Sequence, residues 1–227
     1  MFKKRKQHQK KALFINALSS LCFQGMGSYY WAVNYPKYGV SRIKAIFLNS
    51  QTHQNLPPDK LAWFLSEGHQ HEFATIKEEL MRLSESEQEA LIQSLDPSAA
   101  HKYRIVRRYM NRLTEHGIKA YDLSCCIFNS QMLTRSASLL WSNRKAMPLL
   151  RKERDRLCEN AASLAQSLFS NWTDYMTSYI AGAQFHQQTS ELAEEYTKKQ
   201  EPRIIKLLTS KHSPLQKADW HTALKVD

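Results

Sequence analysis

The segment GHQHEF combines residue types that can do acid–base or metal chemistry. If this segment is helical, His69 and Glu72 lie three positions apart and share one face. An imidazole and a carboxylate placed in this way could form half of a metal site. The sequence has no second pair at ligand spacing and no HExxH pattern, so we expect neither a metal nor a cofactor.

Sequence templates for catalysis are also missing. The chain has no GxSxG, P-loop or GxGxxG pattern, so we assign no catalytic residue. Its four cysteines form no CxxC pair and have no histidine at ligand spacing; they are Cys22, Cys125, Cys126 and Cys158. We interpret them as buried thiols, which is typical of a reduced, cytoplasmic protein.

The segment KYRIVRRYMNRL is a candidate anion-binding face. Arg104, Arg108 and Arg112 recur at every fourth position and would share one helical face, with Arg107 beside them. Planar guanidinium groups match the oxygens of phosphates and carboxylates. A solvated helix face without a binding role is the alternative, and it is the one that we favour.

The net charge of +11 is concentrated at the N-terminus. Six of the first eleven residues are lysine or arginine, so we separate a basic tail over residues 1–11 from a helical domain over residues 12–227. Such a tail could bind nucleic acid or an anionic membrane loosely, or only aid solubility. No run approaches the ~18 consecutive apolar residues of a membrane span.

Helices are the elements that we expect to position these side chains. Apolar residues recur at three- and four-residue spacing and never alternate over a sustained run. With only 6 Gly and 7 Pro, the chain lacks the turns of a β-sandwich or barrel. We predict an all-α fold, either one compact multi-helix domain or two packed lobes with a boundary near 94–99. Expected helices cover 11–23, 41–49, a segment that Pro57 starts and Gly68 ends, 69–83, a segment capped by Ser84 and Glu87, 97–117, 120–140, 146–169, 172–199 and 202–208.

An aromatic stripe marks the helix expected over 172–199. Trp172, Tyr175, Tyr179 and Gly182 follow one another at three- or four-residue steps. The stripe could be a base-stacking platform or the inner face of a helix bundle. Stripes at helical spacing are usually core, so we favour the second interpretation, with Gly182 allowing another helix to approach closely.

Three separated blocks carry a family resemblance. They read WFLSEGHQHEF, IKAYDLSCCIFNSQMLTR, and FSNWTDYMTSYIAGAQF followed by LLTSKHSPLQKADW. In this order they resemble the bacterial family catalogued as domain of unknown function 1266, roughly from Trp63 to Trp220. The family has no assigned activity, so the resemblance implies a helical, cytoplasmic bacterial protein and no particular chemistry.

The resemblance also directs attention to Asp122. In the family pattern Trp-Asp-x-x-Arg the acid is matched here by Asp122, while Tyr121 replaces the tryptophan and Cys125 stands at the arginine position. The resemblance implies that Asp122, Trp172 and Tyr179 belong to one structural feature, and we add Gly182 and His69 to this candidate cluster. We expect Asp122 to accept buried hydrogen bonds, from the Trp172 N–H or a tyrosine hydroxyl.

Three functions follow from these observations. The leading hypothesis is a non-enzymatic protein-interaction module, whose partner could be a chaperone system or one half of a toxin–immunity pair. The second is a nucleic-acid binder that uses the basic tail and the face from Arg104 to Arg112. The third is an enzyme with a pocket near His69, Glu72 and Asp122.

Overall fold

The computed structural model describes residues 2–22, 63, 65–140, 147–187, 189–211 and 213–224. Within these ranges all regular structure is helical and no strand occurs, so the all-α prediction is confirmed. The helix expected at 41–49 and the start expected at Pro57 lie outside the described residues. No helix in the described part of the chain has the length and apolar character of a membrane span.

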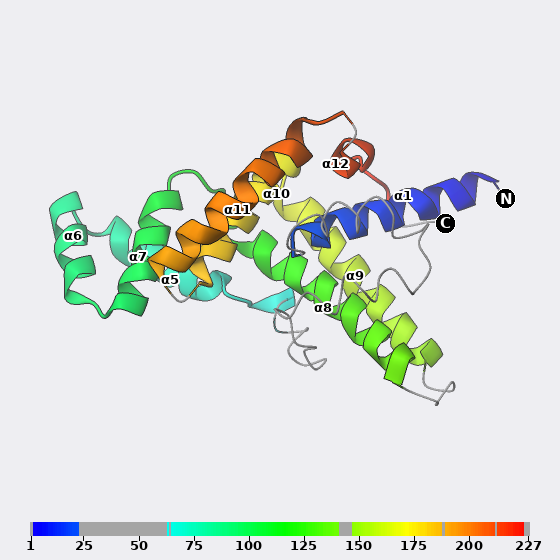
Figure 1. The fold of residues 1–227 in the computed structure, drawn as a ribbon, viewed down its shortest axis with the longest axis horizontal. Helices are drawn as coiled ribbons and strands as arrows, with labels where there is room; N and C mark the ends of the chain where they lie inside the picture. The colour runs from blue at the N-terminus through cyan, green and yellow to red at the C-terminus, as the bar shows by residue number, and fades with distance from the viewer. Residues whose placement is uncertain are drawn as a thin grey trace.

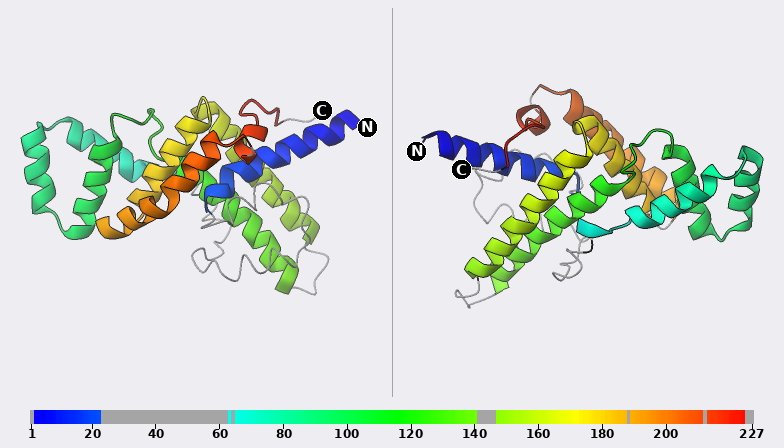
Figure 2. Two further views of the ribbon diagram at one scale, coloured as in Figure 1. Left: turned by 45° about the horizontal axis from the view of Figure 1, so that its top comes forward. Right: turned by 180° about the vertical axis from the view of Figure 1, so that it is seen from behind.

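A long helix pair packs against α1, Phe2–Ser19, and α10, Trp172–Phe185 (Figures 1 and 2). This pair is α8, Lys119–Leu140, and α9, Met147–Leu168, which lie against each other. The C-terminal half of α1 crosses both, and the 3-10 turn η1, Ser20–Cys22, follows it. Helices α10, α11, Ser190–Thr209, and α12, Pro214–Lys217, complete this group.

The three remaining helices form one end of the molecule, as Figure 1 shows. They are α5, Gln70–Met81, α6, Glu85–Ser94, and α7, Pro97–Tyr109. Helix α7 contacts α5, α6 and α10, and so connects this end to the rest. The predicted boundary at 94–99 is therefore the turn between α6 and α7, two helices that touch each other.

The described residues bury two apolar clusters. The larger one joins α1, α8, α9, α10 and α11, with Phe14, Leu18 and Tyr175 among its fully buried side chains. The smaller one joins α5 and α7 to the end of α10, around Phe73 and Phe185, whose ring centroids are 5.7 Å apart. Helix α10 contributes to both clusters, because Tyr175 near its start belongs to the larger one and Phe185 at its end belongs to the smaller one.

Local capping signals start α6 and α7 as predicted. The Ser84 side chain accepts the backbone N–H of Glu87, and the Glu87 carboxylate accepts the backbone N–H of Ser84, which makes a capping box. Asp96 accepts the backbone N–H groups of Ser98 and Ala99 with Pro97 in the first turn. Both starts depend on residues within three positions, which is why the sequence reveals them.

Several predicted helix ends differ from the structure. Helix α10 ends at Phe185 and α11 begins at Ser190, so the single helix predicted over 172–199 is wrong. The Thr189 side chain accepts the backbone N–H of Leu192 and starts α11, which then continues through Pro202 to Thr209. At the other end of the chain α1 begins at Phe2, so the basic segment is helical and continuous with the apolar one.

Candidate functional site

A glycine turn brings the chain into α5. Gly68 has φ of +57° and donates its N–H to the carbonyl of Trp63 at 2.9 Å, so it ends the preceding turn as the sequence predicts. Its surroundings also exclude a side chain, since an added Cβ would lie 2.2 Å from Cγ of Asp122. Glycine is thus required here by the backbone angle and by the approach of α8.

Asp122 caps α5 from a different helix. Its Oδ2 accepts the backbone N–H of His69 at 2.9 Å and that of Gln70 at 3.2 Å. Its Oδ1 lies 2.8 Å from Nδ1 of His69. The side chain of His69, the N-cap residue, makes no local cap, so a fully buried carboxylate 53 positions away satisfies the helix start and faces the positive end of its dipole.

The start of α8 is capped in return from α5. The Gln70 Oε1 accepts the backbone N–H of Ile118 at 2.6 Å, and the Ser178 hydroxyl accepts that of Ala120 at 3.1 Å. Gly117 precedes this start with φ of +51°, and a Cβ there would lie 2.4 Å from Gln70 Oε1. The starts of α5 and α8 therefore interlock, and each requires a glycine beside the partner's capping side chain.

Aromatic rings enclose the His69 side of this interlock. The imidazole of His69 lies 5.2 Å from the Trp63 ring, 5.9 Å from the Tyr121 ring and 4.5 Å from the His186 ring, measured between centroids. Tyr121 also contacts Tyr179 at 5.6 Å. The structure thus groups Asp122 and His69 with Tyr179 of α10.

Gly182 permits the close approach of α10 to α8. A Cβ at Gly182 would lie 2.4 Å from Cβ of Tyr121 and 3.2 Å from Cβ of Ile118. The expected role of Gly182 is therefore confirmed: it allows a second helix to pack at short range. Four of the five members of the predicted cluster meet at this junction of α5, α8 and α10.

Trp172 belongs to a different aromatic group. Its Nε1 donates to the carbonyl of Ala218 at 2.7 Å, and its ring lies 5.0 Å from that of Trp220 and 5.4 Å from that of Phe14. Asp122 accepts buried hydrogen bonds as expected, but its donors are His69 and Gln70, so the expected bond from Trp172 is wrong. The stripe residues Trp172 and Tyr175 help to fasten the C-terminal segment to α1.

Glu72 points away from the junction. Its carboxylate pairs with Lys102 of α7 at 2.5 Å, on a surface where both side chains are partly exposed. His69 and Glu72 therefore do not converge on one ligand. Among the described residues no group of three or more His, Cys, Asp or Glu side chains is placed to hold a metal ion.

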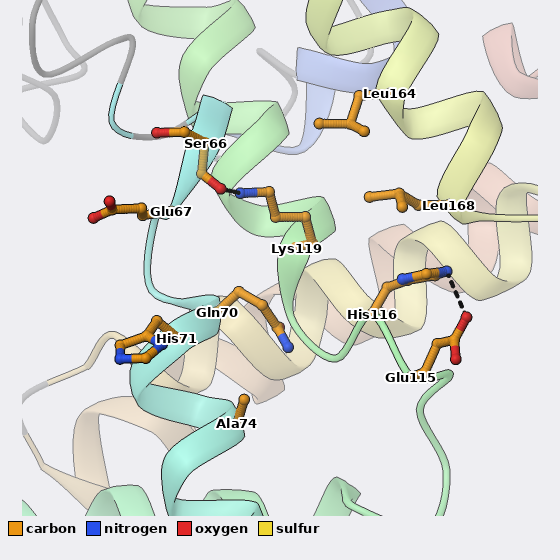
Figure 3. A pocket seen from close by; sticks show the side chains of 10 residues that line it. All are labelled: Ser66, Glu67, Gln70, His71, Ala74, Glu115, His116, Lys119, Leu164 and Leu168. Carbon is orange, nitrogen blue, oxygen red and sulfur yellow. Dashed lines mark hydrogen bonds and ion pairs between the residues drawn. The ribbon is translucent and has the colours of Figure 1, made fainter.

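An open hollow of about 650 Å³ lies beside the junction (Figure 3). Leu164 and Leu168 of α9 and Ala74 of α5 give it an apolar side. Lys119, at the start of α8, donates its ammonium to the carbonyl of Ser66 at 2.9 Å and is only 7% exposed. The other lining residues are Glu67, Gln70, His71, Glu115 and His116.

The match to known families covers the junction and the hollow. A model described as a protein of unknown function, DUF1266, matches residues 58–220, which include α5 to α12 and exclude α1. The chain belongs to the DUF1266 family. No curated protein and no solved structure matches it. The DUF1266 region thus contains both interlocking helix starts and both glycines that they require.

Sequence reasoning missed the partners of Asp122 within the DUF1266 region. Gln70 and Lys119 have no unusual local context, and only the glycines at 68 and 117 signal that two chain reversals occur there. Gly68 ends the turn before α5 and Gly117 lies just before α8, and the sequence does not tell which distant helix approaches them. The helix end predicted at Gly117 is wrong, because α7 ends at Tyr109. Lys119 could have been found only as a basic residue within the second family block, three positions before Asp122.

Cys125, at the arginine position of the DUF1266 pattern, is buried against the end of the α1–η1 segment. Contact with the Cys22 thiol and burial raise the pKa of Cys125 well above its ordinary value. Burial raises the pKa of Cys126 to about 12 and also raises that of Cys158. All four cysteines are buried, as predicted, and none of them forms a disulfide.

The candidate anion-binding arginines do not form one helical face. Arg107 pairs with Glu89 of α6 at 2.7 Å, and this hydrogen bond lowers the pKa of Glu89. Arg104 and Arg108 project from α7, but α7 ends at Tyr109, so Arg112 follows in the turn. The arginine repeat continues past the end of α7. No local sequence signal marks that helix end, so the repeat is interpreted from the sequence as one helical face.

Proposed function

We propose that this DUF1266 protein is a non-enzymatic interaction module of the bacterial cytoplasm and that a protein partner binds at the hollow. The observation that carries the proposal is the contrast between two adjacent regions. At the junction, both oxygens of the Asp122 carboxylate contact His69 or Gln70 at the start of α5, so this carboxylate has a structural role. The hollow beside it is open and combines apolar side chains with a polar rim, as protein-binding surfaces do.

The surroundings of the candidate acids weigh against the enzyme alternative. A pocket near His69, Glu72 and Asp122 would need all three to face one cavity. The lining of the hollow includes none of the three, and Glu72 pairs with Lys102 on the outer side of α5. The buried free thiols agree with a reducing compartment.

Site-specific photocrosslinking tests the proposal. A benzoylphenylalanine at Ala74, inside the hollow, should give one discrete protein adduct in bacterial cells. The same probe at Gln93, an exposed position on α6, is the matched control and should not give this adduct. Adducts that are identical at both positions, or none at Ala74, would contradict a partner at the hollow.

Nucleic-acid binding is the second candidate, and α1 provides the observation that favours it. The exposed side chains of Arg5, Lys6 and Lys10 have no ion pair within the described part of the chain, whereas Lys11 pairs with Glu159 at 2.6 Å. Figure 1 shows that the N-terminal half of α1 extends away from the helices on which its other half packs. Such a basic arm can follow a phosphate backbone.

Salt dependence tests this second candidate. Replacing Arg5, Lys6 and Lys10 by Gln should weaken binding to single-stranded RNA or DNA and reduce the magnitude of the slope of log K against log salt by roughly 0.7 for each phosphate that the arm no longer neutralises. A control variant with Lys198, Lys211 and Lys217 replaced by Gln removes the same charge from exposed positions elsewhere. Equal weakening in both variants would indicate a net-charge effect and would refute binding by the arm.

A further inference from the structure

Lys119 is a buried cation with few hydrogen-bond acceptors. An ammonium group has three donors, and within the described residues its one hydrogen bond is to the Ser66 carbonyl. The residue is 7% exposed, and burial lowers the pKa of its amine even though Asp122 lies close enough to raise it. Within the described residues Asp122 forms its ion pair with His69 and none with Lys119, and both oxygens of its carboxylate accept hydrogen bonds from α5 and the residue before it.

The hollow places this cation beside an apolar surface. In Figure 3 the Lys119 side chain reaches from the start of α8 toward Ser66, and Leu164 and Leu168 face the same space from α9. The space, about 650 Å³, falls within the usual range of small-ligand sites. A buried positive group next to aliphatic side chains favours a ligand with one anionic end and one apolar end.

We propose that the hollow binds a carboxylate with a short aliphatic body, with its anionic group at Lys119 and its hydrocarbon part against Leu164 and Leu168. A ligand oxygen would supply an acceptor that the buried ammonium lacks. This chemistry is shared by free aliphatic acids and by a peptide that ends in leucine. The proposal is independent of a protein partner, since a free acid would satisfy it.

Other ionisable groups at the rim of the hollow affect how strongly a carboxylate would bind at Lys119. The Glu115 carboxylate lies 3.4 Å from Nε2 of His116. Glu67 is exposed on the opposite side, next to Ser66, and in Figure 3 its carboxylate points away from Lys119. His71 is exposed at the rim of the hollow on α5. Glu67 still lies close enough to interact electrostatically with Lys119. Its negative charge therefore opposes an anionic ligand there, and its removal should strengthen binding.

Titration calorimetry with hexanoate, hexanol and hexylamine tests the proposal on the full chain. Hexanoate should bind, and hexanol and hexylamine should bind at least tenfold more weakly. Lys119→Met should weaken hexanoate binding on the order of tenfold or more, because a charge-assisted hydrogen bond is removed. Lys217→Met, which removes an exposed lysine of α12, is the matched control and should leave the affinity unchanged.

Two further measurements keep the test decisive if Lys119→Met does not fold. Glu67→Gln, at an exposed position, should bind hexanoate more tightly, and Leu168→Asp should bind it more weakly. A peptide ending in leucine, compared with its amidated form, distinguishes a peptide terminus from a free acid as the source of the carboxylate. Equal binding of hexanoate and hexanol, no hexanoate binding, or the same affinity in Glu67→Gln as in the unmodified chain would overturn the proposal.

Discussion

Asp122 and Gln70 cap each other's helices. The Asp122 carboxylate of α8 accepts the backbone N–H of Gln70, and the Gln70 amide oxygen of α5 accepts the backbone N–H of Ile118, next to the start of α8. Each helix thus depends on the other for acceptors that would otherwise come from a local N-cap residue. The two starts lie about 50 positions apart in sequence and are joined by hydrogen bonds of 3.2 and 2.6 Å.

Removing the Asp122 carboxylate should destabilise the fold more than removing an ordinary cap. We expect Asp122→Ala to lower the free energy of unfolding by about 2–4 kcal/mol, because buried backbone donors and His69 are left without their acceptor. Asp96→Ala, which removes the exposed local cap of α7, should cost about 1 kcal/mol. Urea denaturation of both variants checks the difference, and equal destabilisation would contradict a special role of Asp122.

A double-mutant cycle should couple Gly68 to Asp122. Gly68→Ala alone should destabilise the protein by more than ~1 kcal/mol, because the positive φ and the contact with Asp122 both disfavour a side chain. In the Asp122→Ala background the steric part disappears, so the same change should cost less. The coupling is measured from four denaturation curves. Strict additivity would show that the short Cβ distance has no energetic consequence.

The thiols should react slowly in the native protein. Cys125, Cys126 and Cys158 are buried and have raised pKa values, so little thiolate is present in the folded protein near neutral pH. An aromatic disulfide reagent should modify all four cysteines rapidly in denaturant and very slowly without it. The kinetics are followed by absorbance. Rapid native modification of two or more thiols would contradict the packing of α8 against α1 and α9.

Stability should decline in alkali partly through Tyr103. Its hydroxyl donates to the Glu79 carboxylate, and this bond raises the pKa of Tyr103 from 10 to about 12. Between these pH values the folded state keeps a proton that the unfolded state has released, so this contribution is complete below pH 10 and disappears as the pH rises to about 12. Tyr103→Phe should therefore lose less stability over that window in urea denaturation. If the free energy of unfolding falls equally with pH in both proteins, a contribution from Tyr103 is excluded.

Sequence patterns predicted the features that depend on residues close together in the sequence. Ser84 with Glu87, and Asp96 with Pro97, mark helix starts because the cap and its donors lie within three positions. The apolar stripe through Tyr175 and Tyr179 indicated a buried face, and both side chains are buried. The end of α10 was missed because the residues after Phe185 contain neither glycine nor proline, and a continuous helix fits their types equally well.

Neighbouring residues were enough to predict that the chain is helical, where two of its helices start and that Gly68 ends the turn before α5. Each of these properties follows from local preferences. Helix packing, by contrast, brings Asp122 to the start of α5, Trp172 to the Ala218 carbonyl and Lys119 to the edge of a hollow. Each of these contacts joins residues about 50 positions apart. No local preference specifies which distant donor or acceptor reaches a buried polar group, so such partners emerge only when whole helices pack together.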